Sequence, residues 1–215
     1  MPHFTLACEA LSREGGEVRF VQVGANDGVR FDDLFQTVTS GGWKGLVIEP
    51  IPEIFERLVT NYRLNRKVTP LNIAIHPSKD SESIFFVKSG SLDKYPDYAY
   101  GLGTMLKPHL VKHGISESDI GEVSVTCARL EQVIDQYNIE CLDVLQIDTE
   151  GFDYQVLRTL NFRRCKPRVI KFEWMNLTIS DKKDARLLLE AEGYSLLIER
   201  GGADCVAINI SLLKI

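Results

Sequence analysis

The sequence predicts a single doubly wound α/β domain with a mainly parallel sheet. Three observations support this prediction. Apolar β-rich runs alternate with helical periods, which is typical of βαβ units. The length of 215 residues suits one domain, and no Pro- or Ser-rich linker divides 1–215. The last two β-rich runs flank Gly201-Gly202, a dipeptide typical of a hairpin turn, so we expect an antiparallel edge at the C-terminal end of the sheet.

The first half of the chain supplies four β-like runs and one clear helix. The runs cover 18–23, 46–48, 68–75 and 84–87. The first run ends in a glycine-containing turn at 24–28, which we expect to open into a helix. After the second run, apolar residues recur with helical spacing, and Pro52 suits the first helical turn. These apolar residues are Ile51, Ile54, Phe55, Leu58, Val59 and Tyr62.

Residues 88–121 differ from the rest of the chain. Turn formers and aromatic residues mix there without a clean period. Long irregular segments in compact domains are usually functional or mobile. We therefore expect a substrate-side insertion that acts as a lid, and the alternative is a disordered surface excursion. Its tyrosines would stack on rings and its glycines would serve as hinges: Tyr95, Tyr98, Tyr100, Gly90, Gly101 and Gly103.

The second half returns to alternation. Further β-like runs cover 123–125, 142–147, 168–174, 194–198 and 205–210. Leu130, Val133, Ile134 and Tyr137 form a helical stripe, and a second helix follows with Tyr154, Leu157 and Leu160 facing inward. A third helix passes through 187–189, capped by Ser180 or Asp181 and closed by Gly193.

Composition and charge exclude several classes of function. Lys and Arg total 25 against 30 Asp and Glu, and this net charge of −5 disfavours nucleic acid as a partner. We expect the basic residues Arg163, Arg164, Lys166 and Arg168 to be solvated. No apolar run approaches the roughly 18 residues of a membrane span, so no membrane partner is predicted. The sequence does not indicate an oligomeric state.

The five cysteines are widely spaced and form no C-x-x-C pair. This pattern argues against a disulfide framework or a zinc knuckle. The N-terminus has no basic region followed by an apolar core, so we expect no signal peptide and a cytoplasmic location.

Ligands of open α/β sheets bind beyond the carboxyl ends of the strands. The first such end carries Gly24, Ala25, Asn26, Asp27 and Gly28. Its glycines allow a ligand to approach the backbone, but the middle glycine of a pyrophosphate-binding G-x-G-x-x-G motif is missing. The polar side chains of Asn26 and Asp27 suit a ligand with an ammonium group instead.

Glu49 ends the second run, 21 residues after Gly28. A carboxylate at this place can accept two hydrogen bonds from vicinal ribose hydroxyls. Together, the turn and the acid predict a nucleoside-derived ligand.

Asp148 and Glu150 follow a run near the sheet centre, in Asp148-Thr149-Glu150-Gly151. Two carboxylates two residues apart in an extended segment would point the same way. One could hold a cofactor, and the other could take a proton from a substrate. The alternative is that one of them only caps the following helix.

The histidines are weaker candidates. His109 and His113 would share one face of a helix, but a third metal ligand is missing, so we predict no metal and a solvated face. His76 follows the third run, where a packed or surface role is expected and lining of a pocket is the alternative. No Walker A, G-x-S-x-G or Cys/His nucleophile pattern is present.

These blocks resemble the FkbM-type S-adenosylmethionine-dependent methyltransferases. The resemblance rests on four segments in order: VGANDG at 23–28, GLVIEP at 45–50, NIAI at 72–75 and DVLQIDTEGFD at 143–153. It implies a class I, Rossmann-like methyltransferase fold with a seven-stranded sheet. It also implies methylation of a hydroxyl oxygen on a small molecule or sugar, with S-adenosylmethionine as cofactor.

The resemblance further implies roles for single residues. The residues Gly24 to Gly28 would lie under the methionine part of the cofactor, and Glu49-Pro50 would meet the ribose. Asn72, Ala74 and Ile75 would lie near the adenine, and Asp148 near the transferred methyl. In one departure, Gln146 stands where the family often has Lys.

The expected catalyst aligns the acceptor oxygen with the methyl and sulfur, and a base takes the hydroxyl proton. We expect Asp148 or Glu150 as this base, with His76 and His109 in reserve. Two alternatives remain at this point. One is a nicotinamide-dependent oxidoreductase, and the other is a non-catalytic nucleoside-binding protein on the same fold.

Overall fold

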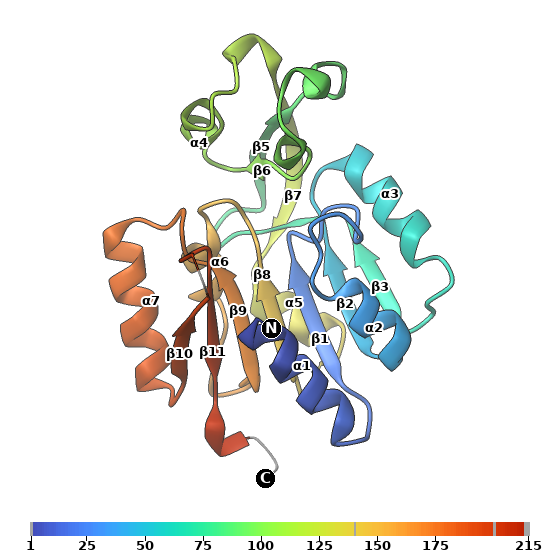
Figure 1. The fold of residues 1–215 in the computed structure, drawn as a ribbon, viewed down its shortest axis with the longest axis vertical. Coiled ribbons are helices and arrows are strands. Elements are labelled where there is room, and N and C mark those ends of the chain that lie inside the picture. Colours follow the sequence, from blue (N-terminus) through green and yellow to red (C-terminus); the bar gives the residue numbers. More distant parts are fainter. Residues whose placement is uncertain (1, 140, 200, 213–215) are drawn as a thin grey trace.

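The computed structural model describes residues 2–139, 141–199 and 201–212. Its main sheet has seven strands in the order β10-β11-β9-β8-β1-β2-β3. The strands are β1 (Arg19–Val23), β2 (Lys44–Ile48), β3 (Val68–Leu71), β8 (Val144–Ile147), β9 (Val169–Glu173), β10 (Ser195–Ile198) and β11 (Asp204–Ile208). All neighbouring pairs are parallel except the two that involve β11. The predicted seven-stranded α/β sheet with its antiparallel C-terminal hairpin is therefore confirmed (Figure 1).

The register of the central strands brings their carboxyl ends together. Val23 of β1 lies opposite Ile48 of β2 and opposite Ile147 of β8. The next residues along the chain, Gly24, Glu49 and Asp148, therefore leave the sheet side by side at one edge.

Helices cover both faces of this sheet. One face packs against α1 (His3–Arg13), α2 (Phe35–Gly41) and α3 (Pro52–Tyr62), and the other against α5 (Leu130–Gln136), α6 (Asp153–Leu157) and α7 (Ile179–Ala191). Side chains alternate between the two faces along β1, so Phe20 belongs to the buried cluster that contains Leu58 on the first face. Val21 belongs to the cluster that contains Leu130 and Leu189 on the second face.

A second sheet follows β3 and corrects part of the sequence analysis. Its order is β4-β7-β5-β6, from β4 (Ala74–Ile75), β7 (Ile120–Ala128), β5 (Ser81–Val87) and β6 (Gly103–Thr104). The predicted third strand, 68–75, breaks at Asn72, whose side chain donates to the carbonyl oxygens of Glu49 and Pro50. The predicted runs at 84–87 and 123–125 belong to β5 and β7, which pair antiparallel in this second sheet.

The segment 88–121 is folded around its own core. It contains α4 (Lys107–Lys112) and the 3₁₀ turns η1 (Ser89–Lys94), η2 (Asp97–Tyr100) and η3 (Glu117–Asp119). Seven buried residues form one cluster: Val87, Leu92, Ala99, Leu102, Leu110, Ile115 and Ile120. The Asp119 carboxylate accepts hydrogen bonds from Ser91, Lys94 and Tyr95. In Figure 1 this part lies above the carboxyl ends of the main-sheet strands.

Three local predictions were wrong or incomplete. The turn at 24–28 does not open directly into a helix, because α2 begins only at Phe35. The cap of α7 is Thr178, whose hydroxyl accepts the backbone N–H of Asp181 at 3.1 Å, rather than Ser180 or Asp181. The helix α1 was not predicted.

Within the described ranges, no helix is both long and apolar enough to cross a membrane.

Candidate functional site

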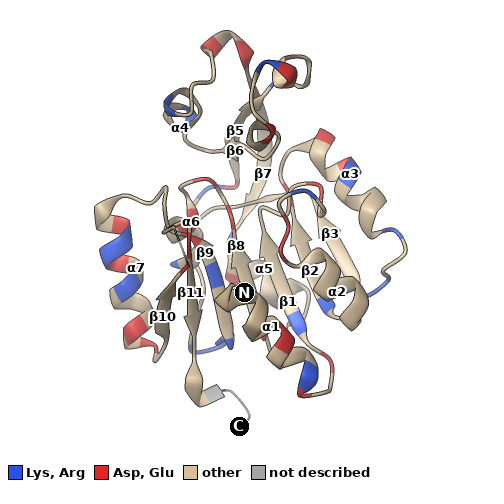
Figure 2. Cartoon of the chain, viewed as in Figure 1, with Lys and Arg blue, Asp and Glu red and all other residues tan. Residues whose placement is uncertain are grey.

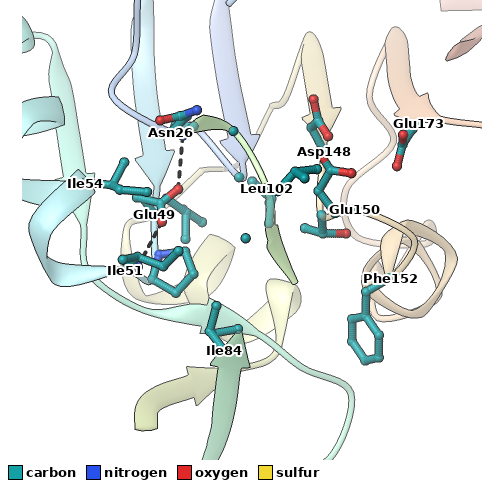
Figure 3. Close-up of a pocket in the computed structure, with 18 of the residues that line it drawn as sticks. Asn26, Glu49, Ile51, Ile54, Ile84, Leu102, Asp148, Glu150, Phe152 and Glu173 are labelled. Atoms are coloured by element: carbon teal, nitrogen blue, oxygen red, sulfur yellow. Dashed lines mark hydrogen bonds between the residues drawn. The ribbon is translucent and has the colours of Figure 1, made fainter. Parts of the chain in front are cut away.

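A pocket of about 450 Å³ opens at the carboxyl edge of the main sheet. The loops after β1, β2, β8 and β9 form one part of its wall, and the second sheet with segment 98–113 forms the rest. In Figure 3, Glu49 and Asp148 lie on opposite sides of this space, with Leu102 between them.

The turn after β1 is held tightly against its neighbours. The backbone N–H groups of Gly24 and Ala25 both donate to the Ile48 carbonyl oxygen, each at 2.9 Å. Gly24 has φ +79°, and a Cβ atom there would lie 1.7 Å from the Asp148 carbonyl oxygen. Only glycine is compatible with this packing, which brings the backbone of the turn to the pocket wall.

Within this turn, Gly24, Ala25 and Asn26 line the pocket, but Asp27 and Gly28 do not. The Asp27 carboxylate accepts the backbone N–H groups of Val29 and Arg30. Gly28 packs against α3, where a Cβ atom would lie 2.7 Å from the side chains of Leu58 and Tyr62. The structure therefore gives Asp27 and Gly28 a supporting position behind the pocket wall.

Glu49 is buried and uses both of its carboxylate oxygens. Oε2 accepts the Asn26 N–H at 3.0 Å, and Oε1 accepts the Ile51 N–H at 2.8 Å (Figure 3). Each oxygen keeps a further lone pair for a ligand. Burial raises the pKa of Glu49 to about 7. The two backbone N–H groups favour the anion and lower the pKa, but their effect is smaller than that of burial.

The segment after β3 forms an apolar wall. Ala74 and Ile75 line the pocket together with Ile51 and Ile54, and Pro50 lies beside them. Asn72 does not line the pocket, because its amide group holds the Glu49-Pro50 backbone.

The Asp148 side chain is exposed to the cavity that it lines, and protein atoms surround this cavity. It has no hydrogen-bond partner in the described part of the chain. This enclosure, together with the charges of Glu150 and Asp153, raises the pKa of Asp148 well above its usual range.

Glu150 also lines the pocket, although its segment is not extended as expected. Its backbone has φ +53°, and Thr104 donates to its carbonyl oxygen at 3.0 Å. Its carboxylate Oε2 lies 3.1 Å from His109 Nε2 of α4. Glu150 therefore joins the loop after β8 to the second-sheet region.

Glu173, at the end of β9, was missed by the sequence analysis. It lines the pocket, and its Oε1 accepts a hydrogen bond from Asn176 Nδ2 at 2.5 Å. Burial and the nearby charges of Glu150 and Asp153 raise the pKa of Glu173 to about 9. Its position at the carboxyl end of a parallel strand was the available signal.

Asp153 supports this acidic region from behind. The side chain is fully buried and accepts hydrogen bonds from Thr149 and from the Glu173 backbone N–H. Burial raises its pKa to about 7.

The histidines differ from expectation. His109 is buried against Glu150, and His113 lines the pocket with its ring centroid 4.5 Å from that of His109, so the predicted solvated face is wrong. Burial lowers the pKa of His113, and the neighbouring His109 acts in the same direction.

His76 is packed, as expected: it stacks on Phe152, and its Nδ1 accepts the backbone N–H groups of Ser78 and Lys79. In the described residues, no group of three or more His, Cys, Asp or Glu side chains is arranged to hold a metal.

Gln146 lies in a polar row across the sheet, opposite Gln22 of β1 and Lys171 of β9. Gln22 and Gln146 line the pocket, and both of their Oε1 atoms are buried without a partner among the described residues. Lys171 pairs with Asp33 and, at 3.2 Å, with Asp204. A lysine therefore lies beside Gln146, on the next strand.

Charge is distributed unevenly between the pocket and the surface. The carboxylates that line the pocket are Asp32, Glu49, Asp148, Glu150 and Glu173, whereas Arg30 is the only Lys or Arg among the described lining residues. Figure 2 shows acidic residues in the loops at this edge of the main sheet.

In the basic run at 163–168, three residues pair with acids: Arg164 with Asp135, Lys166 with Glu192, and Arg168 with Glu14. This surface is therefore not an uncompensated basic patch.

Comparisons with known proteins agree with this geometry. The model of the methyltransferase FkbM domain family matches residues 22–196. Methyltransferase FkbM from Methylobacillus flagellatus KT is similar in structure, with a TM-score of 0.53, 14% identity, and coverage of 89% of this chain and 43% of that chain. The METTL16 MTase domain is similar with a TM-score of 0.52, 10% identity, and coverage of 95% of this chain and 65% of that chain. This chain thus spans less than two thirds of both structures. At such identities the likeness shows a class I methyltransferase fold alone. Curated proteins give no match.

Proposed function

The chain belongs to the FkbM methyltransferase family, and on this premise we propose that it transfers the methyl group of S-adenosylmethionine to a hydroxyl oxygen of a small molecule or sugar. One observation carries the proposal. The Gly24 turn, Glu49 and Asp148 leave adjacent parallel strands in register and line one pocket.

The residues present fit this cofactor. Glu49 would accept the ribose hydroxyls with the lone pairs that its two N–H bonds leave free. The apolar wall of Ile51, Ala74 and Ile75 suits the flat adenine ring. The unpartnered Gln22 Oε1 and the carboxylate of Asp32, which accepts from Gln22 Nε2 at 3.0 Å, suit the ammonium group.

The chain's own residues would orient the acceptor and move its proton. When bound, S-adenosylmethionine supplies a methyl group on an electrophilic sulfonium. Asp148 and Glu150 are the proposed proton acceptors, since both line the pocket where the acceptor hydroxyl would lie. His109 would hold the Glu150 carboxylate in place through the 3.1 Å contact with its Oε2.

The experiment is a screen of hydroxyl compounds for release of S-adenosylhomocysteine by the wild-type protein and by Asp148→Asn and Glu150→Gln. We expect at least one acceptor, and we expect the amide variant of the base to lose turnover while keeping cofactor affinity. Turnover near wild type in both variants would exclude them as the base. Cofactor binding without any turnover would instead favour the non-catalytic alternative.

A further inference from the structure

The part of the pocket beyond Asp148 is shaped by residues from three places in the chain. We call this part the acceptor end and define it by six lining residues: Tyr98, His113, Glu150, Glu173, Met175 and Asn176. The cofactor fit described above uses none of them. The chemistry of these six side chains therefore indicates what kind of molecule receives the methyl group.

Two carboxyl groups of the acceptor end keep oxygens without protein partners. Glu150 Oε2 lies near His109 Nε2 and, at 3.5 Å, Asn176 Nδ2, but its Oε1 has no hydrogen-bond partner among the residues that the structure describes. Glu173 Oε2 is buried without one. Since Asn176 contacts both side chains, the two carboxyl groups are neighbours.

A buried neutral group provides a second, independent observation. Gln146 is 3% exposed and lines the same pocket, and its Oε1 lacks a partner in the described ranges. A buried acceptor without a hydrogen bond costs about 1–3 kcal/mol. Gln146 Oε1 thus offers an acceptor to a ligand with N–H donors, on the strand next to Gln22, whose Oε1 would meet the cofactor's ammonium group.

Among the described residues that define the acceptor end, none is a Lys or Arg, and His109 Nε2 lies 3.1 Å from Glu150 Oε2. Arg30, the only Lys or Arg of the described lining, lies 4.6 Å over the Tyr100 ring and 3.9 Å from Asp27. Lys171 pairs with Asp33 and Asp204. An anionic ligand would disfavour the ionised form of these buried carboxyl groups further, whereas a cationic ligand would favour it, against the burial that raises the pKa of Glu173 to about 9.

Apolar side chains are exposed beside these acids. Tyr98 is 45% exposed and Met175 is 56% exposed, and Phe31, with 62% exposure, lines the same pocket. Large apolar side chains left open at a pocket mouth mark a ligand-binding surface. Aromatic rings also attract cations.

We propose that the methyl acceptor carries a positively charged amine next to an apolar or ring-shaped body, and that Glu150 and Glu173 bind this amine, which leaves Asp148 as the base. The inference deepens the proposed function and rests on it, since it names the class of hydroxyl compound that is methylated. It disfavours acceptors with phosphate or carboxylate groups at this end of the pocket.

The test uses three probes that share one ring and differ in charge: benzylammonium, benzyl alcohol and benzoate. Each is titrated into the full chain by ligand-observed NMR, with and without saturating S-adenosylhomocysteine. We expect benzylammonium to bind at least about tenfold more tightly than benzoate. We expect Glu150→Gln to weaken benzylammonium binding about tenfold, and the double variant with Glu173→Gln to remove the preference.

The matched control is Glu56→Gln, an exposed glutamate of α3 that does not line the pocket. It should leave all three affinities unchanged, and benzyl alcohol binding should persist in every variant. Benzoate binding as tight as benzylammonium, or no binding of any probe, would overturn the inference. Amine preference without S-adenosylhomocysteine binding would contradict the proposed cofactor alone, so the two failures can be told apart.

Discussion

Glu49 connects the chemistry of one residue to the pH response of the site. Its pKa of about 7 in the free protein lies far above that of an ordinary carboxyl. Ribose hydroxyls donate to the anion, so the protonated form should bind poorly. We predict that affinity for S-adenosylhomocysteine is full above about pH 8 and falls as the pH drops through about 7, by up to about tenfold per unit.

Calorimetric titration across this range checks the Glu49 prediction. Glu49→Gln should bind more weakly at high pH and show a flatter profile, because the titrating group is absent. A wild-type profile that is flat between about pH 5.5 and 8.5 would contradict the assigned role.

Gly24 provides a second test at the residue scale. A Cβ atom there would collide with the Asp148 carbonyl oxygen, and the backbone has φ +79°. We predict that Gly24→Ala lowers the free energy of unfolding by at least about 3 kcal/mol, measured by urea denaturation. Gly90→Ala is the control, since nothing lies within 4 Å of its added atom. Equal stability of both variants would refute the packing around the turn.

At the element scale, the segment 88–121 has a core of its own before any ligand arrives. Leu110 of α4 is fully buried in that core, whereas the adjacent Val111 is 46% exposed. We predict that Leu110→Ala destabilises this region by about 2–5 kcal/mol and that Val111→Ala has little effect.

Amide hydrogen exchange, measured separately for each region of the chain, tests the Leu110 prediction. Wild-type amides of β5 and β7 should be protected without ligands, and Leu110→Ala should speed their exchange while β8 and β9 stay protected. Rapid exchange of the amides within 88–121 in the wild type would favour the disordered excursion instead.

The elements differ in how well the sequence predicted them, for physical reasons. The strands β1, β2 and β8 are short apolar runs that end at turn formers, so their place could be predicted locally. The pairing of β5 with β7 joins residues far apart in the chain, and no local pattern encodes it. The helix α1 buries only a narrow stripe of Phe4, Cys8 and Leu11 and has no side-chain cap, which explains why it was missed.

The candidate site likewise contains residues that a local sequence pattern indicates and residues that depend on long-range packing. Glu49 and Asp148 could be predicted because each directly follows a strand, and the rule for open α/β sheets applies to them. His113 and the contact of His109 with Glu150 could not, because they depend on how α4 docks over the sheet. Glu173 obeys the same strand-end rule as Asp148, but its strand carried no family motif.

At the scale of the whole molecule, the buried acids set how stability depends on pH. Burial raises the pKa of Asp153 to about 7, and burial with nearby acids raises that of Glu173 to about 9. The folded state therefore binds protons more tightly than the unfolded state, and stability falls as the pH rises through these values. We predict a larger free energy of unfolding at about pH 6.5 than at about pH 8.5.

Urea denaturation at these two pH values measures this difference. Glu173→Gln should remove much of it, because the amide cannot ionise. Stability that rises with pH over this interval would show that the acidic region is not enclosed as described.

The central claim is that the edge formed by Gly24, Glu49 and Asp148 binds S-adenosylmethionine. Calorimetric titration of the wild-type protein with S-adenosylhomocysteine and, separately, with NAD⁺ tests it most directly. We expect saturable binding of one S-adenosylhomocysteine per chain, lost or strongly weakened in Glu49→Ala, and no binding of NAD⁺. Binding of NAD⁺ without binding of S-adenosylhomocysteine would contradict it.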